Sequence, residues 1–251
     1  MNSMDIIANR EKDGRKIVIL ENEERCAAYI VAFWHKICSQ ILETKPSITI
    51  ALSGGKSPQG TLSALSREQD LPWQKMHIFM VDERFVPPEH EASNYGMIRR
   101  VLLDHVRIPQ ENIHPVDTNL PGPIDAARDY EKKIITHFNL KKPELPRFDI
   151  IMLGLGEDGH TASIFPGSHL LGETKKLVHA VSPGGTLRDR VTLTLPVLNN
   201  ARYILMLVIG RSKTAILEQI IENKDKNLPA SRVRPVNGFL LIIADKHAAG
   251  K

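Results

Sequence analysis

The stretch around which the chain is organised is FDIIMLGLGEDGHTASIFPGS, residues 148–168. It begins with Phe148–Leu153, an apolar, β-branched run typical of a strand buried on both faces of a parallel sheet. Glycines end this run, and three residues that can carry chemistry follow directly: Glu157, Asp158 and His160. In open α/β sheets, ligands bind just outside the carboxyl ends of the strands. We therefore expect the functional site in this loop; the alternative is an ordinary turn in which His160 is a solvated loop residue.

Similar apolar runs recur along the chain and alternate with amphipathic stretches. Strands are expected at residues 47–52, 76–81, 113–116, 148–153, 177–181, 190–195, 203–209 and 237–244. Helices are expected at residues 22–43, after Ser93-Asn94, at residues 124–138 and after Gly210. This alternation predicts a three-layer, mostly parallel, Rossmann-like α/β sheet flanked by helices.

The N-terminal region carries a separate signal. The turn dipeptide Asp13-Gly14 lies between Met4–Arg10 and Arg15–Leu20, which predicts an N-terminal hairpin ahead of the main sheet. Because no internal repeat or linker divides the chain, residues 1–251 are expected to form a single domain.

Composition and charge narrow the classes of function. The net charge is +4 and the basic residues are scattered along the chain, so we expect no nucleic-acid partner. An anionic small-molecule substrate is compatible with this charge. Without an apolar run of membrane-spanning length or a signal-peptide core, a cytoplasmic protein with no membrane partner is expected, as a monomer or a homodimer. Cys26 and Cys38 share one predicted helix and are expected to stay reduced. The ten histidines form neither HxH nor HExxH, so no metal site is expected.

A glycine-rich loop follows the predicted strand at residues 47–52. Its sequence is Ser53-Gly54-Gly55-Lys56-Ser57-Pro58. Adjacent glycines let backbone N–H groups turn toward a ligand at the start of the next helix, which predicts a phosphate cradle. An ordinary tight turn is the alternative, because the loop has neither the Walker lysine spacing nor GxGxxG.

Charged residues also stand at the ends of other predicted strands. Asp82-Glu83-Arg84 follows residues 76–81, Arg190 opens residues 190–195, and Arg211 and Lys213 follow Gly210. Cations at a helix N-terminus oppose the helix dipole and so invite an anion. Three charges at Asp82–Arg84 are costly unless they are used or paired, and a salt-bridged cluster that caps the sheet is the alternative to a binding site.

Taken together, these motifs resemble the 6-phosphogluconolactonases, within the wider group that includes glucosamine-6-phosphate deaminase and ribose-5-phosphate isomerase. The most specific part is GEDGHTAS followed by FPGS. The other matching motifs are Ser53-Gly54-Gly55, Val81-Asp82-Glu83-Arg84, Ser93-Asn94, Arg190-Val191-Thr192-Leu193-Thr194, Gly210 with Lys213, and Leu228-Pro229-Ala230-Ser231. The resemblance covers nearly the whole chain.

The resemblance implies hydrolysis of 6-phospho-D-glucono-1,5-lactone, a sugar-phosphate lactone, without a metal or an organic cofactor. His160 would act as the base, Asp158 would orient it, and Arg84 with backbone amides would stabilise the oxyanion. The substrate would be bound by Ser53, Gly54, Gly55, Asp82, Arg190 and Lys213. At Lys56 the family usually has a hydroxyl residue, and the lysine here would add a phosphate contact.

Two other functions are compatible with parts of this pattern. Glucosamine-6-phosphate deaminases resemble the chain at Asp-Gly-His, but they carry a glutamate where this chain has Phe165 and a tyrosine where it has Arg84. The missing carboxylate argues against opening of an amino-sugar ring. A non-catalytic sugar-phosphate-sensing module is the third interpretation, and the presence of His160, Asp158 and Arg84 argues against it.

Overall fold

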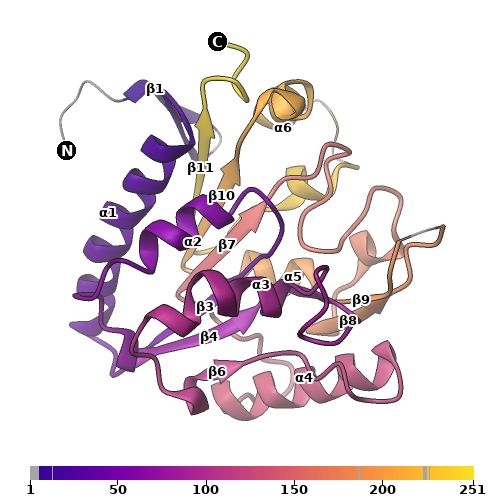
Figure 1. Ribbon diagram of the computed structural model, residues 1–251. Coiled ribbons are helices and arrows are strands. Elements are labelled where there is room, and N and C mark those ends of the chain that lie inside the picture. Colours follow the sequence, from indigo (N-terminus) through magenta and orange to yellow (C-terminus); the bar gives the residue numbers. More distant parts are fainter. Residues whose placement is uncertain (1–5, 13, 186, 223–224, 226) are drawn as a thin grey trace.

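The computed structural model describes residues 6–12, 14–185, 187–222, 225 and 227–251. An eight-stranded sheet runs through its centre (Figure 1). Across the sheet, the strands are in the order β1 (Ile6–Lys12), β2 (Arg15–Leu20), β11 (Phe239–Asp245), β10 (Tyr203–Val208), β7 (Ile150–Gly154), β3 (Ile48–Leu52), β4 (Met76–Met80) and β6 (Ile113–His114). β1 and β2 pair antiparallel and the other neighbours pair parallel.

Helices flank this sheet. They are α1 (Glu23–Leu42), α2 (Gln59–Leu65), α3 (Asn94–Val101), α4 (Pro123–Phe138), α5 (Leu195–Asn199) and α6 (Thr214–Glu222). Helix α1 packs against β2, β3 and β11 and against α2, which in turn contacts α3. The prediction of a mostly parallel α/β sheet flanked by helices is confirmed, and so is the N-terminal hairpin, although its residues Met4, Asp5 and Asp13 lie outside the described residues.

The apolar stripe predicted for helix α1 is the face that the helix buries. Its N-cap Asn22 accepts a hydrogen bond from the Arg25 backbone N–H at 2.9 Å, which satisfies one of the unpaired donors of the first turn. One stripe of the helix is buried, and Trp34 at its centre is fully covered. Cys26 and Cys38 lie on the same stripe as free thiols, as expected.

Strand β7 is the buried centre of the sheet, between β10 and β3. The residue before it, Asp149, is fully buried and accepts hydrogen bonds from the Thr49 backbone N–H and hydroxyl and from Lys45. Its other oxygen lies 3.2 Å from Arg202 Nε. One carboxylate therefore joins the segment after α1 and the starts of β3, β7 and β10.

A second, smaller sheet departs from the expectation of one continuous sheet. Its three strands, in the order β5 (Asp82–Arg84), β9 (Arg190–Leu193) and β8 (Val178–Val181), pair antiparallel. Residues 82–84 were expected as a strand-end loop, yet they form a strand because the chain continues through Val81, which bonds both Leu52 of the main sheet and Leu193 of the small one. Helix α4 packs against β8 and β9 (Figure 1).

Two strands end two residues earlier than predicted, and proline explains both. β6 ends at His114 because Pro115 has no N–H to donate to the ladder. β9 ends at Leu193 because Pro196 lies in the first turn of α5, where a proline is well tolerated. In the described part of the chain, no helix combines the length and apolar character needed to span a membrane.

Candidate active site

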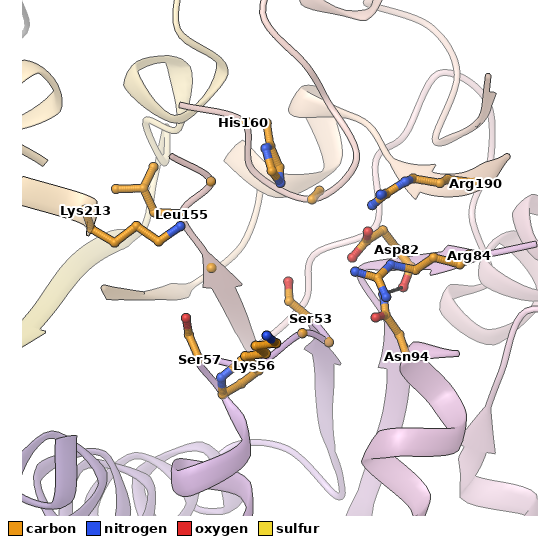
Figure 2. Close-up of a pocket in the computed structure, with 16 residues that line it drawn as sticks. Ser53, Lys56, Ser57, Asp82, Arg84, Asn94, Leu155, His160, Arg190 and Lys213 are labelled. Atoms are coloured by element: carbon orange, nitrogen blue, oxygen red, sulfur yellow. Dashed lines mark hydrogen bonds between the residues drawn. The ribbon is translucent and has the colours of Figure 1, made fainter. Parts of the chain in front are cut away.

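A cleft of about 160 Å³ opens at the carboxyl ends of four neighbouring strands of the main sheet, β10, β7, β3 and β4 (Figure 2). Its walls are the loops that follow these strands, together with strands β5 and β9 of the small sheet and the start of α3. The lining residues are Ser53, Gly54, Gly55, Lys56, Ser57, Pro58, Asp82, Arg84, Asn94, Gly154, Leu155, Gly156, His160, Ala162, Arg190 and Lys213. Every predicted site residue except Asp158 therefore lines one cleft. Asp158 is hydrogen-bonded to one of these lining residues, His160.

His160 and Asp158 form a hydrogen-bonded pair. The His160 Nδ1 lies 2.5 Å from Asp158 Oδ1, and the same oxygen accepts the His160 backbone N–H at 3.1 Å. Burial acts to raise the pKa of Asp158, but these hydrogen bonds and the neighbouring imidazole outweigh it, and the pKa is lowered. Asp158 is thus an ionised acceptor at neutral pH, which places the proton of a neutral His160 on Nδ1 and the lone pair on Nε2. Within the described residues, Nε2 has no hydrogen-bond partner.

A glycine makes this pair possible. A Cβ on Gly156 would lie 2.0 Å from His160 Nδ1 and 2.6 Å from Asp158 Oδ1, so any side chain there would displace the pair. The turn closes through a hydrogen bond from the Gly156 N–H to the His160 carbonyl at 2.8 Å. Ala162, which also lines the cleft, has φ of 53°, a left-handed conformation that is uncommon for a residue with a side chain. The loop therefore requires glycine at position 156 and holds Ala162 in an uncommon backbone conformation.

Arg84 and Arg190 lie side by side on the small sheet. They are register partners across β5 and β9, and Figure 2 shows both extending into the cleft from the same side. Burial and the neighbouring Arg84 charge lower the pKa of Arg190, whereas Asp82 acts in the opposite direction. The Asp82 Oδ2 accepts a hydrogen bond from the Ser163 hydroxyl at 2.6 Å, and Arg190 Nη1 lies 3.4 Å from that hydroxyl. Two arginines that share a single nearby carboxylate favour an anionic ligand.

Glu83 has a different role from its neighbours. It is buried and accepts hydrogen bonds from the backbone N–H groups of Arg84, Asn94 and Tyr95 and from the Ser93 hydroxyl. Burial raises its pKa to about 7, although these hydrogen bonds favour the ionised form. In the described part of the chain, none of the residues Asp82–Arg84 forms a salt bridge with another charged side chain, so the salt-bridged cluster is not found. Glu83 instead accepts the first two backbone N–H groups of α3, those of Asn94 and Tyr95.

The glycine loop forms the floor of the cleft. Among the described residues, no hydrogen bond uses the backbone N–H of Gly54, Gly55, Lys56 or Ser57. Gly55 has φ of 101°, which favours glycine. The Ser53 hydroxyl is buried without a protein partner in the described structure. The loop therefore presents several unused donors to the cleft.

Asn94 is a lining residue that sequence reasoning assigned only to helix capping. Ser93 is the actual N-cap of α3 and accepts the Gly96 N–H, which leaves the Asn94 side chain to point toward the glycine loop. Asn94 Nδ2 donates to the Asp82 carbonyl at 2.9 Å, and a Cβ on Gly54 would lie 2.0 Å from Asn94 Oδ1. Gly54 is needed because this side chain fills the space. The paired Ser93-Asn94 signal was visible in the sequence, but the direction of the second side chain was not.

One further cation, Lys213, approaches from the opposite side. Figure 2 shows Lys213 entering across the cleft from Arg190, with the glycine loop between them. Lys213 Nζ is 3.9 Å from Glu157 Oε1, and its side chain is only 15% exposed. Lys56 is exposed at the rim, whereas Arg211 is exposed and does not line the cleft. Lys213, rather than Arg211, is thus the cation of that loop that reaches the site.

Phe165 does not line the cleft itself, but it contacts two residues that do, His160 and Arg190. Its ring centroid lies 4.9 Å from that of His160, and the Arg190 guanidinium lies 5.3 Å from its centroid. An aromatic ring can support both neighbours by stacking and by a cation–π contact, but it supplies no acid or base.

Comparisons with known proteins agree on one family. A family model described as glucosamine-6-phosphate isomerases/6-phosphogluconolactonase matches residues 21–242. The 6-phosphogluconolactonase of a Synechocystis species is 42% identical over 202 residues, covering 80% of this chain and 82% of the relative. The solved 6-phosphogluconolactonase of Thermotoga maritima is 35% identical with a TM-score of 0.78, covering 91% of this chain and 98% of that one. The Trypanosoma cruzi enzyme has a TM-score of 0.83 at 31% identity, covering 94% and 96%.

Proposed function

The chain belongs to the glucosamine-6-phosphate isomerase/6-phosphogluconolactonase family, and on this premise we propose that it hydrolyses 6-phospho-D-glucono-1,5-lactone to 6-phospho-D-gluconate, the second step of the oxidative pentose phosphate pathway. The observation that carries the proposal is the His160–Asp158 pair at the edge of a cleft that also holds two arginines and a glycine loop with unused N–H groups. Lactone hydrolysis needs a base and an oxyanion stabiliser, and the phosphate needs an anion cradle.

The chemical step follows from the tautomer of His160. Nε2 accepts a proton from water as the water oxygen attacks the lactone carbonyl carbon, and Asp158 stabilises the imidazolium that forms. The tetrahedral intermediate then collapses, the bond between the carbonyl carbon and the ring oxygen breaks, and the imidazolium returns its proton to that oxygen. The product is the open-chain acid, and His160 is again neutral.

Positive charge near the carbonyl stabilises the developing oxyanion. Arg84 is placed for this role because its guanidinium is fixed by a hydrogen bond from Nη1 to the Ala92 carbonyl at 2.7 Å and extends into the cleft. Its Nε is buried without a protein partner in the described structure. A preorganised cation of this kind stabilises charge without having to move during the reaction.

The phosphate is bound above the glycine loop. Backbone N–H groups of Gly54, Gly55 and Lys56 form the floor, and Arg190 and Lys213 approach from opposite sides. The Lys56 side chain, at the rim, adds a further cation. Asp82, held by Ser163, presents its other oxygen as an acceptor for a sugar hydroxyl. Neither the base nor the phosphate cradle in this scheme uses a metal ion or an organic cofactor.

The deaminase alternative is disfavoured by the residue at position 165. The position five residues after His160 holds Phe165, whose ring packs against the imidazole and provides no carboxylate for sugar-ring opening. The sensing alternative does not account for the ordered His160–Asp158 pair, because a module that only binds a phosphate needs no base.

A direct assay separates these functions. The purified protein is given freshly generated 6-phosphogluconolactone, and 6-phosphogluconate is followed by its dehydrogenase, with the spontaneous hydrolysis measured without enzyme and subtracted. We expect hydrolysis well above this background and no ammonia from glucosamine 6-phosphate. Ammonia release at a comparable rate would reassign the protein as a deaminase, and binding without turnover of either compound would reassign it as a sensor.

A further inference from the structure

We propose that His77, His114 and His137 form a binding site for a divalent transition-metal ion, for which Zn²⁺ is the best-fitting candidate. The three residues come from the start of β4, the end of β6 and the last turn of α4. One ring nitrogen of each lies within 4.8 Å of the others. The cluster is distinct from the candidate active site, because His77 lies near the beginning of β4 whereas Asp82 and Arg84 follow its end.

The spacing is close to that of a metal-bound histidine set. His77 Nδ1 and His114 Nε2 are 3.2 Å apart. In a tetrahedral zinc site with Zn–N bonds of about 2.0–2.1 Å, two ligand nitrogens are roughly 3.3 Å apart. The third nitrogen, on His137, is within 4.8 Å of both, so a rotation of its side chain completes the set. All three side chains are half-buried, which leaves a fourth position open to water.

The protonation state of the cluster also suits a metal ion. Burial is the main cause that lowers the pKa of all three imidazoles, to about 4 for His114 and His137. They are therefore neutral at pH 7, with lone pairs available, and binding at that pH releases no proton from an imidazolium. The cations that face the cluster are already engaged, since Lys133 pairs with Asp129 and Lys45 with Asp149.

Packing alone does not explain the cluster. Phe79 stacks on His114 with ring centroids 4.2 Å apart and an interplanar angle of 18°, and its ring also lies 5.0 Å from that of His137. A hydrophobic core of this kind would be served as well by apolar side chains. Instead, His77 and His114 are joined by a hydrogen bond, and in the described structure the His137 ring has none. A shared metal ion would engage one nitrogen of each of the three rings.

A bound ion would join three elements at the edge of the molecule. β6 is a two-residue edge strand, and α4 lies beside it (Figure 1). Coordination would fix this strand and the end of α4 to β4. The expected effect is on stability rather than on catalysis, because a ligand that binds only the folded state stabilises it.

The test uses tag-free, chelator-treated full-length protein and ZnCl₂ in isothermal titration at pH 7.5. We expect one Zn²⁺ per chain at this cluster, a rise in melting temperature with Zn²⁺, and affinity weakened by at least about tenfold in both His137→Ala and His114→Gln. The matched control is His179→Ala, which removes a member of the other close histidine pair, with His169 at a ring distance of 5.2 Å. This control should bind as the native protein does.

Three outcomes would overturn the site: no Zn²⁺ binding by the native protein, unchanged binding in both cluster variants, or loss of binding in His179→Ala. Circular dichroism and lactone hydrolysis identify a variant that fails to fold. For that case, a Zn²⁺-soaked crystal of the native protein gives a second measurement. Anomalous density between the three rings supports the site, and density only elsewhere refutes it.

Discussion

At the scale of single residues, the proposed chemistry depends on a glycine and a carboxylate that together position one imidazole. Gly156 leaves the space into which His160 and Asp158 fit, and Asp158 accepts the Nδ1 proton. The sequence predicted the participants because the GEDGHTAS motif places them close together along the chain. It did not predict the steric role of Gly156, which becomes visible only when the loop folds back and brings the His160 ring over the glycine.

Replacing His160 by Asn should lower kcat by about 10²–10⁴-fold, because a general base contributes this much, while KM changes little. The rates are measured with the no-enzyme rate subtracted. His35→Asn is the matched control, since His35 forms only a surface pair with Glu68 at 3.0 Å. A folded His160→Asn protein with near-native kcat would exclude this mechanism and make Asp158 or Asp82 the next base to test.

Arg190→Ala should separate phosphate binding from chemistry. A charge-assisted hydrogen bond contributes roughly 1.5–3 kcal/mol, so KM for the phosphorylated lactone should rise by about 10- to 150-fold. Unphosphorylated gluconolactone should be affected little. The control variant is Arg99→Ala, because Arg99 is exposed and forms a surface pair with Asp104 at 3.6 Å. An equal loss on both substrates would show that Arg190 supports the structure rather than the phosphate.

At the scale of elements, the main sheet is held together at its amino end as well as by its core. Asp149 connects the starts of three adjacent strands while its side chain is fully buried. Sequence patterns identify such strands through their apolar runs, but a lone aspartate after an aromatic residue gives no sign that it accepts hydrogen bonds from two neighbouring segments. The contact becomes predictable only once the strand order is known.

Asp149→Ala should reduce the free energy of unfolding by about 3 kcal/mol, because it removes several hydrogen bonds to a buried charge and leaves Lys45 and Arg202 without their partner. Urea denaturation measures the change. The control is Asp125→Ala, which removes an exposed pair with Arg128 and should change stability by less than about 0.5 kcal/mol. Similar losses in the two variants would contradict a special role for Asp149.

At the scale of the whole molecule, the histidine cluster should make stability depend on pH. His114 and His137 have pKa values of about 4 in the folded protein, below the ordinary value of 6.5. Between these values the unfolded chain binds more protons than the folded one. The free energy of unfolding should therefore fall as the pH drops from 6.5 toward 4, and this loss should be absent above 6.5.

Urea denaturation of metal-free protein at pH 7.5 and pH 5 checks this expectation. A double variant with Asn at both positions should lose less stability between the two pH values than the native protein does. Comparing slopes removes any constant difference in stability between the proteins. Equal slopes would show that these two histidines do not titrate with lowered pKa values.

The same scale shows where sequence reasoning ends. The strands of the main sheet were predicted because their apolar runs are long enough to recognise. Strands β8 and β9 of the small sheet were predicted as well, but β5 and the separate sheet were not, because β5 is the charged tripeptide Asp82–Arg84 and its pairing with β9 joins segments more than a hundred residues apart. The histidine cluster was not predicted for the same reason, because its three residues belong to three elements that are far apart in the sequence. The single domain, the cytoplasmic location and the monomeric or homodimeric state stay predictions.

The division into two sheets has a mechanical consequence for the cleft. Arg84 and Arg190 belong to the small sheet, whereas His160, Lys213 and the glycine loop follow strands of the main one. In the proposed scheme, a phosphate held by Arg190 and Lys213 links the two sheets, and helix α4 packs against the smaller one. There, the Glu131 carboxylate of α4 accepts the Leu177 backbone N–H at 2.7 Å, just before β8. If the phosphate is held in this way, we expect substrate affinity to depend also on α4 residues such as Glu131, which support the small sheet but do not line the cleft.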